Sequence, residues 1–482
     1  MKKAIAIILL AVVMAAFCAR GSKPFSRGSQ LEHNVARSFT TDDRLSHFII
    51  DGREVEGNMS GVAVIDASAD GRTALAEVNS VTVAFVSEAG VDLLGTTVSN
   101  AEISFDGRVA CYGEGESFMR YSLDTRSSEA LTDNVYAIKQ IAISPASKCI
   151  ALSALYKDEG EKARSALFMD GQTVPVLEGV NATVLAVSDD GSLIYYIDRD
   201  TNDFYVSKGG EATLISEAHG ANSVYNFSKD LSEVSYLTSE SANMLFRLSD
   251  GLNIKLCDGF GFTLKTDVYS ISRGEIPVYI NDIESFLSGL FVRYKSLNGE
   301  RYYDVGLVDG EGGISWLVED CRDYQIAFPQ GRIVSTLGAV LRSTDSKGRT
   351  KELANDVVSF KMTADGGTIY YISKANSLFM IKGTGKPKRL ETGVSSFALI
   401  NGYCFYIKDK PAGEDLDTAG RLMRTDGKET VDMGKNAVRF DTRAGQLLIY
   451  TDPVITEYGT NYGLFYTVNG EEFTASFEGV EP

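Results

Sequence analysis

The sequence predicts an all-β protein built from repeated units of four short strands. One motif recurs along the chain: an apolar run, a tight turn that often contains Gly, and a second apolar run. Apolar and polar residues alternate in these runs, which is the period of a β-strand, and long helical patterns are absent. From Gly71 to Leu231 the successive turns are 36, 40, 44 and 40 residues apart. Repeats of this length, with four strands each, are typical of the blades of a β-propeller.

The clearest copy of the repeat begins at Ala182 and contains two hairpins, with the strands ATVLAVS and LIYYID on either side of the first turn. Gly in that turn supplies the positive φ that a tight hairpin requires. The equivalent turns elsewhere are Asp70-Gly71, Asp106-Gly107, Ala146-Ser147, Asp230-Leu231, Arg273-Gly274, Gln330-Gly331, Asp365-Gly366, Asn401-Gly402 and Ala444-Gly445. We therefore predict about eight to ten units, in one ring or two, because a single propeller usually has about four to eight blades.

Spacing also suggests the domain boundaries. We expect the repeats to span residues 60–482. The interval of 57 residues between Arg273 and Gln330 predicts an insertion near 275–305, or else a boundary between two propellers. Residues 20–59 are polar and fit the repeat poorly, so they are expected to form a linker or to close a ring beside the last blade.

The N-terminus predicts export. Met1-Lys2-Lys3 is basic, residues 4–17 form an uncharged apolar run, and polar sequence begins at Arg20. This order describes a secretory signal peptide, here residues 1–19, and the run is shorter than the ~20 residues that cross a bilayer. An uncleaved membrane anchor and a buried helix are the alternatives.

Cys18 is a candidate lipidation site. The segment Ala15-Ala16-Phe17-Cys18 resembles a bacterial lipobox, in which the Cys becomes the lipidated first residue of the mature chain. Phe17 departs from that pattern, which has a small residue at this position. The resemblance implies a periplasmic or cell-surface protein that contacts a membrane only through its N-terminus.

The net charge narrows the class of partner, and the spacing of the cysteines argues against a zinc site. The formal net charge is −18, so nucleic acid and anionic membrane surfaces are not expected as partners. Five Cys follow Cys18, and they lack the close spacing of a zinc site. Cys111, Cys149 and Cys404 lie in apolar strand-like runs, where we expect them to act as small core side chains.

The sequence shows no sign of an enzyme. The chain has three His residues, His33, His47 and His219, and they are scattered. No GxSxG elbow, P-loop or GxGxxG motif is present, so we predict no catalytic or cofactor-binding residues. The alternative is a carbohydrate-active hydrolase with carboxylates facing a central channel, since such a site needs only two or three of the 65 acidic residues.

One acidic cluster is a candidate Ca²⁺ site. Asp198, Asp200 and Asn202 have the 1-3-5 spacing of an EF-hand loop. Asp203 replaces the Gly of position 6, and Gly209 replaces the Glu of position 12. The competing interpretation is a polar turn between two strands.

The repeat resembles a known family. The segment IAISPASKCIALS, from Ile141, is similar to the TolB-like repeat, an apolar strand followed by Ser-Pro-Asp-Gly and a second apolar strand. The segments from Val184 and Val357 match the same unit more fully. A WD-type propeller is less similar, because Trp316 is the only Trp. The resemblance implies a β-propeller of the bacterial cell envelope that binds a protein or a glycan through its loop face without catalysis.

Overall fold

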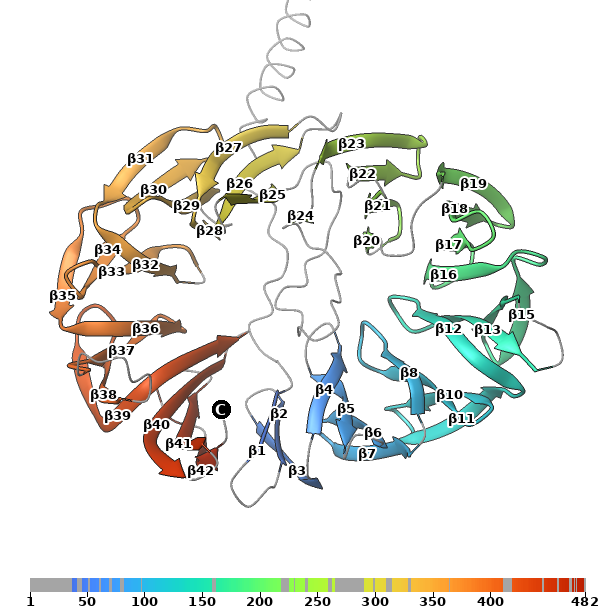
Figure 1. Cartoon of the computed structure of the whole chain (residues 1–482), viewed down its shortest axis with the longest axis horizontal. Helices are drawn as coiled ribbons and strands as arrows, with labels where there is room; N and C mark the ends of the chain where they lie inside the picture. The colour runs from blue at the N-terminus through green and yellow to red at the C-terminus, as the bar shows by residue number, and fades with distance from the viewer. Residues whose placement is uncertain are drawn as a thin grey trace, which may run out of the picture. The chain divides into compact units, whose positions relative to one another are not determined.

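The computed structural model confirms the all-β prediction. Its described residues hold 42 strands and no helix (Figure 1). Within each sheet, consecutive strands pair with each other and run antiparallel. The chain divides into two compact units. The smaller comprises residues 1–27, 261–265 and 287–392, and the larger comprises residues 28–260, 266–286 and 393–482. The structure describes residues 37–40, 46–50, 53–59, 62–68, 72–78, 82–96, 98–157, 162–217, 225–228, 230–238, 242–258, 262–264, 290–297, 300–308, 314–327, 331–363, 365–410, 418–443, 446–456, 459–467, 470–471, 473 and 475–480.

The larger unit contains five four-stranded sheets in chain order. They follow one another side by side, coloured from blue to green in Figure 1. Their strands are β4 (Val62–Ala67), β5 (Thr73–Val78), β6 (Thr82–Ser87), β7 (Gly90–Gly95), β8 (Val98–Ile103), β9 (Val109–Glu114), β10 (Ser117–Ser122), β11 (Ser127–Thr132), β12 (Val135–Ile143), β13 (Cys149–Tyr156), β14 (Arg164–Met169), β15 (Gln172–Val176), β16 (Ala182–Val187), β17 (Leu193–Asp198), β18 (Asp203–Lys208), β19 (Glu211–Ser216), β20 (Tyr225–Phe227), β21 (Glu233–Leu237), β22 (Ala242–Arg247) and β23 (Leu252–Asp258).

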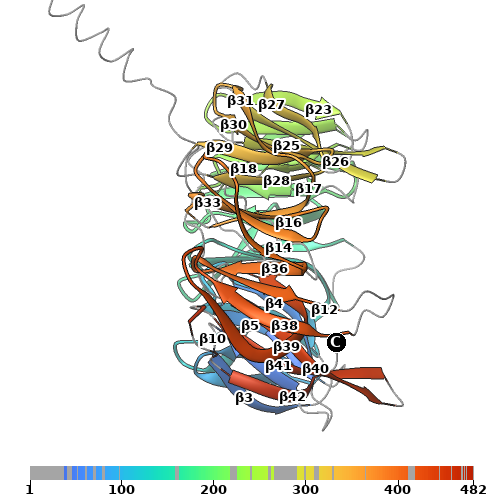
Figure 2. The ribbon, with the colours of Figure 1, turned by 90° about the vertical axis from the view of Figure 1, so that its left-hand side faces the viewer.

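The C-terminal part of this unit is a seven-stranded sheet, in which two repeats share a strand. Strand β39 pairs with β38 through its first half and with β40 through its second half, and Figure 2 shows β36, β38, β39 and β41 in this sheet. Counting β39 in both repeats gives two more units of four strands. The strands are β36 (Val394–Ile400), β37 (Tyr403–Lys408), β38 (Gly420–Thr425), β39 (Thr430–Arg443), β40 (Gln446–Thr456), β41 (Gly459–Thr467) and β42 (Ala475–Val480).

The smaller unit holds three four-stranded sheets. Together with the seven repeats of the larger unit they make ten four-stranded repeats among the described residues, within the predicted range. Their strands are β24 (Phe262–Leu264), β25 (Leu290–Leu297), β26 (Glu300–Val308), β27 (Ile314–Cys321), β28 (Asp323–Ala327), β29 (Arg332–Leu337), β30 (Val340–Asp345), β31 (Thr350–Ala354), β32 (Val357–Met362), β33 (Thr368–Ser373), β34 (Ser377–Lys382) and β35 (Lys388–Thr392).

The structure describes only parts of the N-terminal segment and of the predicted insertion near 275–305. The signal peptide (residues 1–19) and Cys18 lie outside the described residues. Within residues 20–59, strands β1 (Arg37–Thr40), β2 (Ser46–Ile50) and β3 (Arg53–Met59) form a three-stranded sheet beside β4–β7. The predicted insertion near 275–305 is described only from Leu290, where the chain forms β25 and β26 of a regular sheet. No helix in the described part of the chain is long and apolar enough to span a membrane.

Where the structure describes them, the predicted turns join the first two strands of a repeat. Asp70-Gly71, Arg273-Gly274 and Ala444-Gly445 lie outside the described residues. Gly107 and Gly191 have φ values of 68° and 69°, and the degenerate copies Ser147 and Leu231 adopt the same left-handed conformation, each with φ 58°. Leu231 is not β-branched, which lowers the steric cost of a left-handed backbone. Its side chain is buried in the core, and this packing offsets the remaining cost.

A hydroxyl and a carboxylate close each well-formed turn. In the turn before β17, Ser188 Oγ donates to Asp190 Oδ1 (2.6 Å) and accepts from Leu193 N (2.9 Å). Asp190 Oδ1 also accepts from Ser192 N (3.0 Å). The same pattern recurs at Ser228 with Asp230 and at Thr363 with Asp365. These donors satisfy the carboxylate in its ionised form.

The turn carboxylate should make stability depend on pH. The hydrogen bonds from Ser188 and Ser192 lower the pKa of Asp190 to about 2, below the ~3.9 of an unfolded chain. Its stabilising effect is therefore complete above about pH 4 and is lost as the pH falls toward 2. We expect the Asp190→Asn variant to lack this part of the pH dependence. The difference should be no more than about 1 kcal/mol, because solvent screens an exposed carboxylate. Urea unfolding of both proteins between pH 5 and pH 2 measures it, and parallel pH curves would contradict the assignment.

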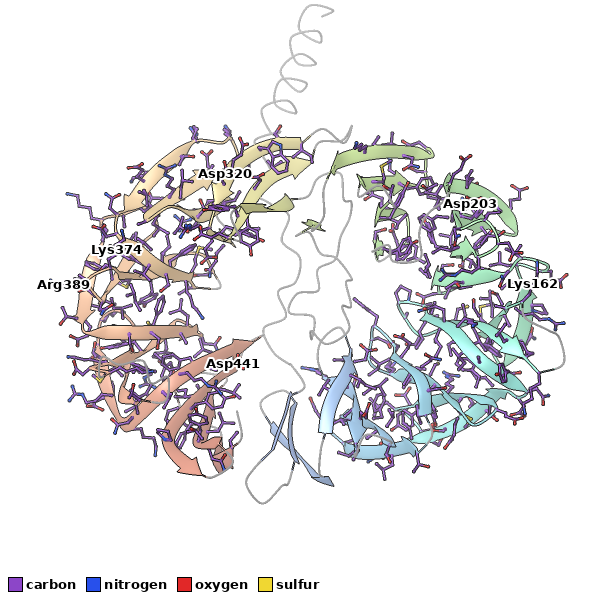
Figure 3. The ribbon with its side chains drawn as sticks, in the orientation of Figure 1. Lys162, Asp203, Asp320, Lys374, Arg389 and Asp441 are labelled. Carbon is purple, nitrogen blue, oxygen red and sulfur yellow. The ribbon has the colours of Figure 1, made fainter. Side chains whose placement is uncertain are left out.

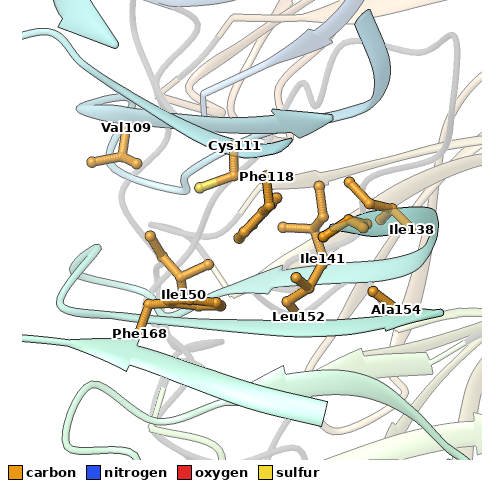
Figure 4. Close-up of a cluster of buried hydrophobic side chains, with 10 residues drawn as sticks. Val109, Cys111, Phe118, Ile138, Ile141, Ile150, Leu152, Ala154 and Phe168 are labelled. Atoms are coloured by element: carbon orange, nitrogen blue, oxygen red, sulfur yellow. The ribbon is translucent and has the colours of Figure 1, made fainter. Parts of the chain in front are cut away.

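The core lies between neighbouring sheets. Figure 4 shows one cluster, in which Cys111 and Phe118 of one sheet pack against Ile141, Leu152 and Phe168 of the next. Cys111, Cys149, Cys321 and Cys404 are buried, which confirms that Cys111, Cys149 and Cys404 act as small core side chains. Within each unit, neighbouring sheets pack against one another, and four-stranded repeats that pack in this way are the blades of a β-propeller.

Candidate functional site

The candidate Ca²⁺ residues lie in the tight turn between β17 and β18. Asp198 ends β17, and its Oδ1 accepts a hydrogen bond from Asp200 N (2.9 Å). Asn202 adopts φ 61°, and its N–H donates to Asp198 O (2.7 Å) to close the turn. The backbone thus brings the three predicted residues into one turn, as the competing interpretation expects.

Both carboxylate oxygens of Asp200 already have partners, one in the preceding blade and one in the segment just before β16. Oδ2 accepts from Lys162 Nζ (2.6 Å), and Oδ1 accepts from Asn181 Nδ2 (2.8 Å). Lys162 lowers the pKa of Asp200, and the same hydrogen bond raises the pKa of Lys162. Figure 3 labels Lys162 and Asp203 in this region. The turn carboxylate therefore joins two blades.

Metal ligation at this turn stays a prediction. In the ranges that the structure describes, no group of three or more His, Cys, Asp or Glu side chains is arranged to hold a metal ion. Binding Ca²⁺ here would require Asp200 to exchange its ion pair with Lys162 for metal ligation.

A second feature, which the sequence did not reveal, is a bulge near the start of the first strand of several blades. The register of β12 shifts between Val135 and Ala137, and that of β32 shifts between Val357 and Ser359. The residue left over is Tyr136 in the larger unit and Val358 in the smaller one. Their exposed fractions are 70% and 64%. A bulge re-aims the side chain that it extrudes, so the fold presents both residues to solvent.

The backbone around these bulges is held in place by side chains from the preceding blade. Asn100 Nδ2 donates to Ile138 O in β12 (3.0 Å), and Gln325 Oε1 accepts from Met362 N in β32 (2.6 Å). These contacts satisfy polar groups on the edge of the first strand. Tyr136 therefore projects from a fixed backbone position.

The loop before Tyr136 is polar and acidic. Asp133 Oδ1 accepts from Ser117 Oγ (2.6 Å), and Asn134 adopts φ 63° at the entry to β12. Glu116, in the β9–β10 turn, forms an ion pair with Lys157 of the next blade. We call Tyr136, Asp133, Asn134 and Glu116 the Tyr136 face.

The described cysteines are poorly suited to nucleophilic catalysis. Burial raises the pKa values of Cys149 and Cys321 to about 12, and it raises the pKa of Cys111 as well. A thiol needs a lowered pKa to react as a thiolate near neutral pH. These three side chains therefore serve packing.

Comparison with known proteins gives similarities at low identity. No family model matches the chain, and no curated protein matches it. Solved structures similar to it include TolB from Acinetobacter baumannii, with 13% identity over 53% of this chain and 63% of that chain, and a TM-score of 0.30. The tricorn protease is 12% identical over 83% of this chain and 49% of that chain, with a TM-score of 0.27. Dipeptidyl peptidase 4 from Porphyromonas gingivalis is 11% identical over 81% of this chain and 66% of that chain, with a TM-score of 0.37.

The chain thus spans less than two thirds of the length of each of these three structures. Similarity at this level assigns neither an activity nor a ligand to the protein.

Proposed function

We propose that the protein is a non-catalytic, extracytoplasmic β-propeller that binds a protein or glycan partner through its loop face, with Tyr136 at the contact. The observation that carries this proposal is the 70% exposure of Tyr136 on a bulged strand. Among the described residues, Tyr136 is the only aromatic side chain among the large apolar residues that are exposed. Tyr is enriched at the centres of protein interfaces, and its ring offers apolar area with little loss of conformational entropy on binding.

Charge on the Tyr136 face favours a neutral or basic partner. Asp133 precedes Tyr136 by three residues, Glu116 accepts a backbone hydrogen bond from Val135 N (2.9 Å), and the whole chain carries a net charge of −18. An approaching anionic polymer would meet repulsion, whereas a basic one would be attracted. Export is supported by the basic start and the apolar run of residues 4–17. The hydrolase with channel-facing carboxylates stays the alternative prediction.

Truncation of Tyr136 tests the proposal. We expect Tyr136→Ala to weaken partner binding at least about tenfold, the effect of losing an interface anchor worth more than about 1.4 kcal/mol. A photoreactive phenylalanine at position 136, used in intact cells, identifies the partner, and binding of the purified partner then gives the affinity.

Leu214 provides the matched control. It is 44% exposed, but it lies on β19, the last strand of its blade. A photoreactive residue at 214 should not crosslink the same partner, and Leu214→Ala should leave its affinity unchanged. Equal crosslinking from both positions would refute the role of the Tyr136 face. Hydrolysis of a glycan by the purified protein would refute the non-catalytic assignment.

A further inference from the structure

Arg439 lies over two tyrosine rings in the C-terminal sheet. Its guanidinium carbon is 4.3 Å from the ring centroid of Tyr450 and 5.3 Å from that of Tyr462. The two rings meet edge to face, with centroids 5.8 Å apart. Arg439 and Tyr450 are direct partners in the pairing of β39 with β40, while Tyr462 comes from β41. Three adjacent strands therefore build one cluster, which we call the Arg439 cluster.

The sheet holds this cluster rigidly. Tyr462 is buried, with an exposed fraction of 5%, whereas Arg439 is exposed. The register of β39 shifts between Ala437 and Arg439, which changes the direction of the side chains that follow. Stacking on aromatic faces fixes the plane of a guanidinium and leaves its edge available for hydrogen bonds.

Arg439 differs from two other arginines that lie over tyrosine rings. Arg424 lies 4.9 Å from the ring centroid of Tyr403 and donates to the carbonyl oxygens of Gly470 and Glu471. Arg322 lies over Tyr302 and forms an ion pair with Glu300. Arg439 has neither kind of partner among the described residues, although Asp441 follows it on the same strand (Figure 3). Its hydrogen-bond donors therefore remain available to a ligand.

We infer that the Arg439 cluster is a recognition site for a carboxylate group of a partner polypeptide. A guanidinium edge matches a carboxylate in two parallel hydrogen bonds. The guanidinium lies over the Tyr450 ring and the Tyr462 ring is buried, so the exposed group of the cluster is the charged one, which favours an anion over a stacked sugar. Arg and Tyr are also the residues that dominate protein interfaces. Because the chain is acidic overall, binding here depends on this local geometry and not on a general attraction for anions.

A labelled poly-L-glutamate peptide tests the site in the full-length chain by fluorescence anisotropy. We expect saturable binding that Arg439→Gln weakens at least about tenfold, since charge-assisted hydrogen bonds are lost. Arg439→Lys should weaken it nearly as much, because an ammonium keeps the charge but not the fork. Saturable binding that is unchanged in Arg439→Gln, or fully retained in Arg439→Lys, would overturn the inference, as would no binding by the wild type.

Lys435 supplies the matched control. It lies 4.2 Å from the ring centroid of Phe465, which pairs with Ile449 on the opposite face of the same sheet. Lys435→Gln makes the same change in charge and should leave binding within about twofold, a difference smaller than one lost hydrogen bond. Equal weakening by Lys435→Gln and Arg439→Gln would mean that net charge alone is sensed, and it would overturn the inference.

Variants of Tyr450 test whether the effect comes from stacking and not from misfolding, and competition with a sugar polymer tests for another class of ligand. Tyr450→Phe should retain binding, whereas Tyr450→Leu should weaken it with an unchanged circular dichroism spectrum; equal binding by both variants would refute the stacked geometry. Polygalacturonate competing better than poly-L-glutamate, in an Arg439-dependent way, would refute a polypeptide source. Tyr136→Ala should bind poly-L-glutamate like the wild type, so this inference and the proposed function can fail separately.

Discussion

Replacing Phe118 with alanine should lower the free energy of unfolding of the larger unit by about 3–5 kcal/mol, the usual cost of emptying a buried aromatic site. Phe118 is fully buried and lies between two blades, with its ring centroid 5.5 Å from that of Phe168. Removing the ring leaves a cavity at the place where β10 meets β14. The blades cannot close this cavity without moving against their other neighbours, so little of the loss is recovered.

Urea unfolding followed by far-ultraviolet circular dichroism measures this loss. Phe118→Leu retains most of the apolar volume and should cost less than about 1.5 kcal/mol. Leu214→Ala removes an exposed leucine from the same unit and should change stability by no more than about 0.5 kcal/mol. A cost for Phe118→Ala close to that of Leu214→Ala would show that the contact between these two blades contributes little to folding.

The repeat could be predicted from the sequence because each blade begins with the same local chemistry. Even the copies without Gly, at Ser147 and Leu231, have the predicted place between the first two strands and the same left-handed backbone. This information is local, since a turn and the two alternating runs beside it are contained in about 20 residues.

The sequence did not predict where one blade passes directly into the next. Strand β39 runs for 14 residues from the end of one repeat into the start of another, so the chain has no loop there to mark a boundary. Residues 37–59 could not be assigned to the repeat either, because their three short strands lack the alternating apolar pattern of the blades. Both features depend on strand pairing, which a local pattern does not specify.

The candidate sites depend on register, and this is why they could not be predicted. Tyr136 looks like an ordinary strand residue in VYAIKQIAI, and only the bulge in β12 exposes it. Arg439, Tyr450 and Tyr462 lie on three strands, and one slip in pairing would separate them. Asp198, Asp200 and Asn202 were predictable as a polar turn, but the contact of Asp200 with Lys162 crosses between blades.

Replacing Arg332 with alanine should destabilise the smaller unit by about 3 kcal/mol, because two charge-assisted hydrogen bonds are lost at a buried position. Arg332 is the first residue of β29, with an exposed fraction of 6%, and burial lowers the pKa of its guanidinium. Nη1 donates to Gly383 O (2.8 Å) and Nη2 donates to Gly366 O (2.7 Å), both in turns of the next blade. Truncation leaves these carbonyl oxygens without their donor.

Trp316 makes this loss measurable in the smaller unit. It is the only Trp in the chain and lies in β27, so its fluorescence reports unfolding of that unit. Arg332→Met keeps the apolar stem but has no donors, and it should be nearly as unstable as Arg332→Ala if hydrogen bonding dominates. Arg349→Ala breaks only an exposed ion pair with Asp345 and should cost less than about 1 kcal/mol. If Arg332→Met were as stable as the wild type, Arg332 would act through packing, and its hydrogen bonds to the neighbouring turns would add nothing to stability.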